Sequence, residues 1–340
     1  MKITDLTLKS LFAALFFSLA LAAPGSAFAW GRMGHDLSAR TAARLLADTT
    51  KKSFYKTHST DLGYYSNVPD LIWKKPPTYE VEWTNHFMDM EIYERELKKA
   101  VEEGRWSAKE DPYDLGRAAF DAKFPSITQQ AGRAFWRIRE FEKRLQKTAE
   151  LLKQKDILKE ERHRLQLEWL IVAGTMAHYV SDLSQPLHVT ENYDGQMTEQ
   201  KGIHGHFEDT LVDELWPSID MQVFKDAQKL WEKEQNTLAG KTSLALIKDL
   251  ASASTKDAEE ILKKDKKVSR EDLKKAAEVY RPIIVRRLAA GAVVLAELWR
   301  RHSNWQPNEE RFFSFTGEPA YIEVPKPTPT PSPTPKAPKK

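Results

Sequence analysis

Helical periodicity dominates the chain from Asp36 onward, and no other feature constrains the fold as strongly. In the segment 36–48, for example, Ala39, Ala42 and Leu46 recur at spacings of three and four residues and share one side, with Asp36 placed to cap or begin the helix. We find no sustained alternation of apolar and polar residues of the kind that marks a strand. The sequence therefore predicts an all-α fold.

The strongest helical pattern lies at 157–184, which turns strongly apolar toward its end, so this helix is expected to be central and buried. The stretch 55–92 instead contains two aromatic-rich parts and three prolines, and we interpret it as irregular. No linker interrupts 30–315, so we expect one multi-helix bundle domain at 30–323. The other segments expected to be helical are 94–104, 129–155, 203–216, 222–236, 242–264 and 271–302.

Both ends of the chain differ from this body. Residues 1–29 combine two early lysines, a short apolar run and an Ala-x-Ala triplet, which predicts a signal peptide cleaved before Trp30. The alternative is an uncleaved membrane anchor, but the apolar run is too short to span a bilayer. We therefore expect an exported protein, periplasmic or secreted, that is not transmembrane. Residues 324–340 form a Pro/Thr/Lys tail expected to be disordered, and a tether to anionic cell-envelope material is the alternative.

The chain contains no cysteine, which removes disulfides, thiolate nucleophiles and cysteine-type zinc sites from consideration. Its formal net charge of +3 comes from the ends, because residues 1–29 carry +1 and residues 324–340 carry +4, which leaves −2 for 30–323. A slightly acidic body argues against a protein that holds nucleic acid through a broad basic surface. Any metal must be held by His, Asp, Glu or main-chain atoms.

Two histidines are each followed by a carboxylate one helical turn later. His178 and Asp182 share one face of the apolar helix, and His204 and Glu208 repeat the spacing further along the chain. Either pair alone would more often be structural. An unpaired buried carboxylate is costly, however, and a metal ion is one of the few partners that makes its burial favourable.

The nine histidines divide into candidate ligands and others. His188 closely follows the first pair, and His35 and His86 add two further donors. These are more ligands than one ion needs, so several ions are expected, and His/Asp/Glu ligation without thiolates suits zinc. The residues alone thus indicate a multi-metal hydrolase. The remaining histidines are assigned to the surface (His58, His163 and His302) or to the opposite side of their helix (His206).

Two stretches resemble a known superfamily, which comprises the zinc-dependent phospholipases C of bacteria and the single-strand-specific zinc nucleases of fungi and plants. The stretch from Trp30 to His35 (WGRMGH), directly after the expected cleavage site, is similar to the mature N-terminus of the nuclease branch. The stretch from His178 to His188 is similar to the core motif that both branches share. The resemblance covers about 30–208 in its motifs, and it implies an all-helical bundle of that superfamily's type.

The resemblance further implies three zinc ions. The terminal Trp30 would bind one of them through its own amino nitrogen and carbonyl oxygen, and Asp182 would bridge that ion to another. Zinc in such a cluster lowers the pKa of bound water, so that hydroxide can attack phosphorus near neutral pH. Asp70 is expected to orient that water or act as its general base. The implied ligands are Asp70, His86, His178 and Asp182 for the first ion, His188, His204 and Glu208 for the second, and Trp30 and His35 for the third.

The signals for the substrate are divided between the two branches. The N-terminal motif has the short spacing of the nucleases, whereas Glu208 follows the phospholipase pattern, since nucleases usually carry aspartate there. Met33 and Leu71 lack the glutamate and the aromatic ring expected for phosphatidylcholine, and only Trp83 could offer a cation–π face. We therefore expect an endonuclease acting on single-stranded DNA or RNA first, and a phospholipase C acting on phospholipid headgroups second.

A nuclease needs rings on which bases stack and cations for phosphate. Trp83 and Tyr193 are candidate stacking residues and Lys74 is a candidate phosphate contact, although aromatic rings at this density usually belong to a core. A third hypothesis is an inactive zinc-binding protein of the cell envelope, which is the weaker one because all nine ligand positions are occupied. No stable protein partner is inferred. Further candidates near the site in sequence are Tyr64, Tyr65, Trp73 and Lys75.

Overall fold

The computed structural model describes residues 30–50 and 53–307, which form helices and their connections. Within these residues there is no strand, and β-type pairing is limited to an isolated antiparallel bridge between Met88 and Gly132. The all-α prediction is confirmed. The predicted signal peptide at 1–29 and the predicted tail at 324–340 lie outside the described residues.

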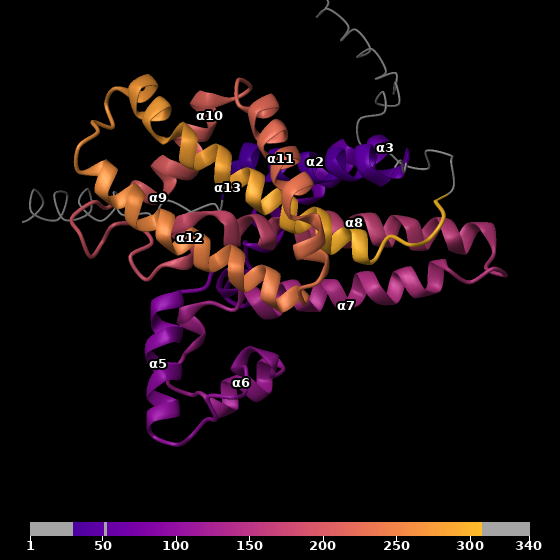
Figure 1. Ribbon diagram of the computed structural model, residues 1–340, viewed down its shortest axis with the longest axis horizontal. Coiled ribbons are helices and arrows are strands. Elements are labelled where there is room, and N and C mark those ends of the chain that lie inside the picture. Colours follow the sequence, from indigo (N-terminus) through magenta and orange to yellow (C-terminus); the bar gives the residue numbers. More distant parts are fainter. Residues whose placement is uncertain (1–29, 51–52, 308–340) are drawn as a thin grey trace, which may run out of the picture.

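Long helices build the body of the molecule, and short helical segments connect them (Figure 1). The long helices are α2 (Gly31–Thr50), α3 (Ser53–Tyr65), α5 (Met90–Glu102), α7 (Ala134–Leu152), α8 (Lys159–Ser184), α11 (Asp220–Ala239), α12 (Ser243–Asp265) and α13 (Leu273–Arg301). The short segments are η1 (Pro69–Trp73), α4 (Tyr79–Glu82), η2 (Trp83–Asn85), η3 (Pro112–Asp114), α6 (Arg117–Lys123), η4 (Gln129–Ala131), η5 (Pro186–Val189), α9 (Ile203–Gly205), η6 (His206–Thr210) and α10 (Leu211–Leu215). Of these, η1 and η6 are π-helical, and η2, η3, η4 and η5 are 3₁₀ turns.

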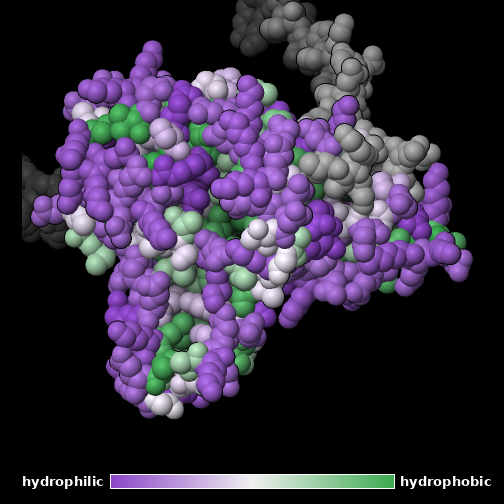
Figure 2. All heavy atoms as spheres, in the orientation of Figure 1, coloured by the Kyte–Doolittle hydropathy of each residue, from purple (hydrophilic) through white to green (hydrophobic). Residues whose placement is uncertain are grey.

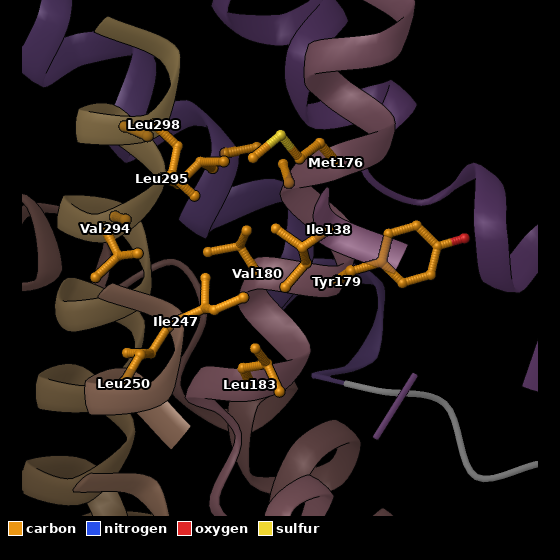
Figure 3. Close-up of a cluster of buried hydrophobic side chains, with 14 of the residues drawn as sticks. Ile138, Met176, Tyr179, Val180, Leu183, Ile247, Leu250, Val294, Leu295 and Leu298 are labelled. Atoms are coloured by element: carbon orange, nitrogen blue, oxygen red, sulfur yellow. The ribbon is translucent and has the colours of Figure 1, made fainter. Parts of the chain in front are cut away.

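Helix α8 is the centre of the bundle. It contacts α2, α3, α7, α12 and α13, and its C-terminal half is buried on every side. Figure 3 shows Val180 and Leu183 of α8 directed toward Ile138 of α7, Ile247 of α12 and Leu295 of α13. Each such side chain contributes about 1.5–3 kcal/mol when it is fully buried. The prediction of a central, buried helix is confirmed, with α8 beginning two residues later than expected.

Helices α5 and α6 project from the other helices at one side of the molecule (Figure 1). The buried Arg133 fastens this projection, because its guanidinium donates hydrogen bonds to the hydroxyl of Tyr93 at 2.6 Å and to the carbonyl of Ile127 at 2.7 Å, and pairs with Asp121 at 2.8 Å. The face in Figure 2 is mainly hydrophilic, with small hydrophobic patches. Among the described residues, no helix combines the length and apolar character that crossing a bilayer needs.

Two expectations for the N-terminal part of the chain are wrong. Helix α2 begins at Gly31 rather than near 36, so Asp36 lies inside it and pairs with Arg40 at 3.1 Å instead of capping it. The stretch interpreted as irregular contains α3, whose Phe54 packs edge-on against Trp169 of α8. The helix packs between other aromatic rings, so its own sequence is rich in aromatic residues. This density of aromatic residues hides the helical periodicity of the segment.

Candidate metal centre

The eight predicted His, Asp and Glu ligands are all buried, with at most 5% of each residue exposed. They come from separate elements that converge beside α8: His35 from α2, Asp70 from η1, and His86 directly after η2. Together they form three groups whose ligand atoms lie within 4.8 Å of one another, and each group could hold a metal ion. The groups are His35 with His178 and Asp182, Asp70 with His86 and His178, and His188 with His204 and Glu208.

We call the four residues expected for the first ion, Asp70, His86, His178 and Asp182, the first group. Their nitrogen and oxygen atoms face one another. His86 Nδ1 lies 2.8 Å from His178 Nε2 and 3.1 Å from Asp182 Oδ2. Asp70 Oδ1 lies 3.6 Å from both of these nitrogens. The structure thus brings together the four side chains predicted for the first ion.

Asp182 faces two groups through its two oxygens. Its Oδ2 lies 3.3 Å from His178 Nε2, whereas its Oδ1 lies 3.4 Å from Nε2 of His35. The His35 ring stacks on His178, with ring centres 3.9 Å apart, so His178 also belongs to this second group. A carboxylate whose two oxygens face two different ligand groups in this way is arranged to bridge those groups.

Trp30 is fully buried at the start of α2. Its indole donates a hydrogen bond to Ser184 Oγ at 2.9 Å, and its ring packs on Phe207 at 5.7 Å. A side chain at Gly31, where φ is +32°, would collide with the Asp209 carboxylate, so only glycine fits this approach. The main chain at Trp30 and Gly31 is thereby held next to the segment that carries Glu208.

The remaining group gathers around Glu208. Its Oε2 lies 2.9 Å from His204 Nε2 and 3.5 Å from His188 Nε2, and it accepts a hydrogen bond from Gln185 at 2.7 Å. The predicted single helix at 203–216 is divided here into α9, the π-helical η6 and α10. His204 and Glu208 still meet at the i, i+4 spacing, and π-helical turns of this kind often occur at functional sites.

Hydrogen bonds from the outer nitrogens of three histidines fix the orientation of their rings. Nδ1 of His178 bonds the carbonyl of Ser66 at 2.7 Å, Nδ1 of His188 bonds the carbonyl of His86 at 2.8 Å, and Nδ1 of His204 bonds the carbonyl of Tyr193 at 3.0 Å. A carbonyl only accepts, so each Nδ1 must carry a proton, and in the neutral ring the lone pair then lies on Nε2. This is the tautomer of a histidine that ligates a metal through Nε2.

Burial and neighbouring charges both shift the pKa values of these groups. Burial lowers the pKa of His35, His86 and His178 well below the ordinary value, so these rings are neutral. Burial alone would lower the pKa of His204, but Glu208 outweighs burial and raises it. Burial, and then the charge of Asp70, raises the pKa of Asp182 well above its usual range. Burial alone would also raise the pKa of Glu208, but His204 and His188 outweigh it and hold the pKa at about 2. Neutral imidazoles facing buried carboxylates are a donor set that a cation would stabilise.

Several buried atoms in these groups make no hydrogen bond within the described part of the chain, among them both nitrogens of His35, Oδ1 of Asp182 and Oε1 of Glu208. Leaving such atoms unpaired in a protein interior is unfavourable. Divalent metal ions fit these residues, and the prediction of several buried ligand groups is confirmed. The choice of zinc stays a prediction, to which the absence of thiolates and the imidazole content give chemical support.

Two outer residues of the site were not predicted from the sequence. Glu82 Oε1 lies 3.6 Å from His86 Nε2, and Gln185 holds Glu208. Glu82 stands four residues before His86, so it repeats the spacing of the other two pairs in reverse order. That repetition was the available signal. Gln185 gave none, because a lone glutamine has no characteristic spacing.

The three candidate substrate residues lie at different places relative to the groups. Lys74 Nζ is 3.3 Å from Asp70 Oδ1. Tyr193 is 48% exposed and meets the His204 ring edge-on at 5.9 Å. The half-buried ring of Trp83 packs against Phe87 at 5.3 Å. Lys74 and Tyr193 therefore adjoin ligand residues directly, whereas the ring of Trp83 has a packing role.

The further candidates also divide. Tyr64 is 44% exposed, and Lys75 is exposed as well. Tyr65 is buried, and Trp73 stacks on Phe141 with ring centres 6.3 Å apart. The core interpretation therefore holds for Tyr65 and Trp73.

Among the histidines assigned elsewhere, His58 was placed wrongly. It is buried, and its Nδ1 lies 2.8 Å from Asp61 Oδ2 in α3. The polar sequence around it hid a buried hydrogen-bonded pair. His163 and His302 are half-buried, and His302 Nε2 contacts Glu142 at 3.1 Å. His206 is half-buried and belongs to none of the three groups.

Comparison with known proteins adds no assignment. No model of a known protein family matches the sequence. No curated protein matches it either.

Proposed function

We propose that this protein is an exported, zinc-dependent phosphodiester hydrolase of the superfamily it resembles, acting as a nuclease on single-stranded DNA or RNA. The observation that carries the proposal is the orientation of His178, His188 and His204. Each ring donates a hydrogen bond from Nδ1 to a main-chain carbonyl and turns Nε2 toward a buried carboxylate. A core histidine has no need of this repeated arrangement, whereas a metal ligand does.

The chemistry assigned to this chain's own residues centres on Asp70. When bound, zinc supplies Lewis acidity that makes hydroxide available near neutral pH and offsets the negative charge of the phosphate. Asp70 Oδ1 lies 3.6 Å from His86 Nδ1 and from His178 Nε2, so it is placed to orient the attacking water and take its proton. The Lys74 ammonium beside that oxygen is positioned to hold a phosphate oxygen. Trp30 and His35 would hold the third ion, and Asp182 would link it to the first.

Exposed rings support a nucleic-acid substrate. Tyr193 adjoins His204, and Tyr64 precedes Asp70 by six residues, so both could stack bases near the groups. A second candidate, a phospholipase C, is favoured by a different observation. Leu71, Ile72 and Val81 are 41%, 58% and 71% exposed on the segment that follows Asp70, and exposed apolar side chains there would suit a lipid surface.

The test is elemental analysis of protein cleaved before Trp30, assayed in parallel on single-stranded DNA, RNA and phosphatidylcholine micelles. We expect about three zinc ions per chain, as the resemblance implies, and shortening of the nucleic acids. Asp70→Asn should lower the rate by about 100-fold or more, because it removes the proton acceptor and weakens one ligand. Asp226→Asn, an exposed aspartate of α11, is the matched control and should keep full activity.

The other outcomes separate the hypotheses. Zinc with release of a phosphorylated headgroup alone would move the protein to the phospholipase branch. Zinc without turnover of any of these substrates would favour the inactive envelope protein. Protein that holds no zinc would refute all three.

A further inference from the structure

Glu82 is a buried carboxylate at the end of α4, next to the first group but outside it. Its Oε1 accepts a short hydrogen bond from the hydroxyl of Tyr179, and its Oε2 accepts hydrogen bonds from Arg137 at 3.1 Å and from Asn85 at 3.2 Å. Five per cent of the residue is exposed. Three donors, one of them a guanidinium, fix the carboxylate in place.

The donors themselves are held firmly. Tyr179 belongs to the buried half of α8 and stacks on Phe141 at 5.5 Å. The Arg137 guanidinium lies 4.8 Å from the centre of the Phe141 ring, and Asn85 accepts a hydrogen bond from Arg117 at 2.9 Å. The position of Glu82 is therefore determined by α7 and α8, and not by the short helix that carries it.

His86 differs from the other histidines of the centre in how it is turned. It directs Nδ1, rather than Nε2, at the group, 2.8 Å from His178 Nε2 and 3.1 Å from Asp182 Oδ2. Its outer nitrogen is Nε2, which has no hydrogen-bond partner within the described residues. Glu82 Oε1 faces that nitrogen at 3.6 Å, a distance longer than a hydrogen bond.

We propose that Glu82 is a positioning residue for metal binding, which keeps the proton of His86 on Nε2 and so leaves Nδ1 free to ligate the first ion. His178, His188 and His204 rely on main-chain carbonyls for this, whereas His86 relies on a carboxylate side chain. A carboxylate behind a ligating imidazole both fixes the tautomer and raises the basicity of the ligand. A small movement of the His86 ring toward Glu82 when the metal binds would allow the Nε2–H group to donate a hydrogen bond to Glu82. The inference rests on the proposed metal centre and does not depend on which ester the protein cleaves.

The test compares Glu82→Gln with wild type by zinc retention during competition with a chelator. Glutamine keeps the size but removes the charge, and its amide nitrogen could face Nε2 and favour the wrong tautomer. We expect the most weakly held zinc of the variant to bind about 10–100-fold more weakly. Cobalt substitution supplies a second readout, since loss of one imidazole ligand changes the visible absorption of the cobalt in that group.

Glu142→Gln is the matched control. Glu142 also faces a histidine, because its Oε1 lies 3.1 Å from His302 Nε2 and accepts from Ser243, but it stands outside all three groups. This control should lose stability without losing zinc affinity. Glu82→Asp keeps the charge on a shorter side chain and should lose less affinity than Glu82→Gln, which separates the effect of charge from that of folding.

Equal zinc affinity in wild type and Glu82→Gln would overturn the inference while leaving the proposed hydrolase intact. Equal loss in Glu82→Gln and Glu142→Gln would also overturn it, because the effect would then be general destabilisation. A wild type that binds zinc but cleaves no phosphodiester would refute the proposed function and leave the role of Glu82 to be decided by these affinities.

Discussion

At the scale of the residue, the burial of Asp89 makes the stability of the folded protein depend on pH. It is 8% exposed at the start of α5, and burial, followed by the charges of Glu91 and Glu191, raises its pKa from 3.8 to about 7. Between about pH 4 and pH 7 the folded protein keeps a proton on Asp89 that the unfolded chain has lost. Stability contributed by this group therefore falls as the pH rises through that window and is constant above it.

We predict that Asp89→Asn makes the folded protein more stable than wild type at pH 8 and little different at pH 4. Each unit of pKa corresponds to about 1.4 kcal/mol, so the gain should amount to a few kcal/mol. Urea unfolding at the two pH values measures it, with zinc content matched between the proteins. If both proteins change their unfolding free energy equally between pH 4 and pH 8, Asp89 is not the source. Asp226→Asn serves as the exposed control.

Residue spacing was sufficient for part of the centre. The i, i+4 pairs His178–Asp182 and His204–Glu208 follow from helical geometry alone, and both pairs meet in the structure. Spacing could not reveal that Asp182 faces His35, because those two residues come from different helices. The grouping of ligands across elements came from the resemblance to a family. His58 was missed because a buried pair of polar side chains and a solvated one look alike in sequence.

At the scale of the element, the contact between α3 and α8 depends on Gly174. A Cβ atom built at this position would lie 2.5 Å from Tyr65 Cβ and 3.1 Å from the carbonyl oxygen of Leu62. Neither atom can rotate away as the end of a long side chain could. The absence of a side chain therefore allows α3 to pack closely against α8, upstream of η1 and Asp70.

We predict that Gly174→Ala destabilises the protein by about 1–2 kcal/mol. Overpacking costs about 1–3 kcal/mol, and the better helix propensity of alanine returns up to about 1 kcal/mol. The free energy of unfolding in urea measures the balance. Gly116→Ala is the control, because a Cβ there meets nothing within 4 Å, and it should change stability little. A stabilised Gly174→Ala protein would show that the two helices separate without cost.

Most of the long helices were predictable, with α3 as the exception, and the short ones were not, for a physical reason. The segment 157–184 carries apolar residues over many turns, so its expected bounds differ from those of α8 by two residues at one end. The π-helical turns η1 and η6 are five residues long, and they pack against other elements, η1 against α4 and η6 against α2, so local preference alone does not set their backbone. Because Asp70 and Glu208 both lie in such turns, sequence periodicity fails at the site itself.

At the scale of the whole molecule, the centre joins parts of the chain that are distant in sequence. Its ligands run from His35 on α2 to Glu208 on η6, and α8 supplies the two that stand between the others. Without a cation, the fold must bury Asp70, Asp182 and Glu208 close together, which is unfavourable. A bound ion would therefore act as a cross-link between these elements.

We predict that removing metal with a chelator lowers the melting temperature markedly and that zinc restores it. An ion that binds only the folded state stabilises it by about 2.7 kcal/mol per site when its free concentration is 100 times Kd, and three groups would add their contributions. Circular dichroism during heating measures the shift, with magnesium as the control, because imidazole-rich groups bind it poorly. His188→Gln should shrink the zinc-dependent shift, since it removes one ligand, whereas His206→Gln, which changes a neighbouring histidine outside the groups, should leave it intact. An unchanged melting temperature after verified metal removal would contradict the view that this bundle is organised around its ligand groups, because three buried carboxylates would then be stable together without a cation.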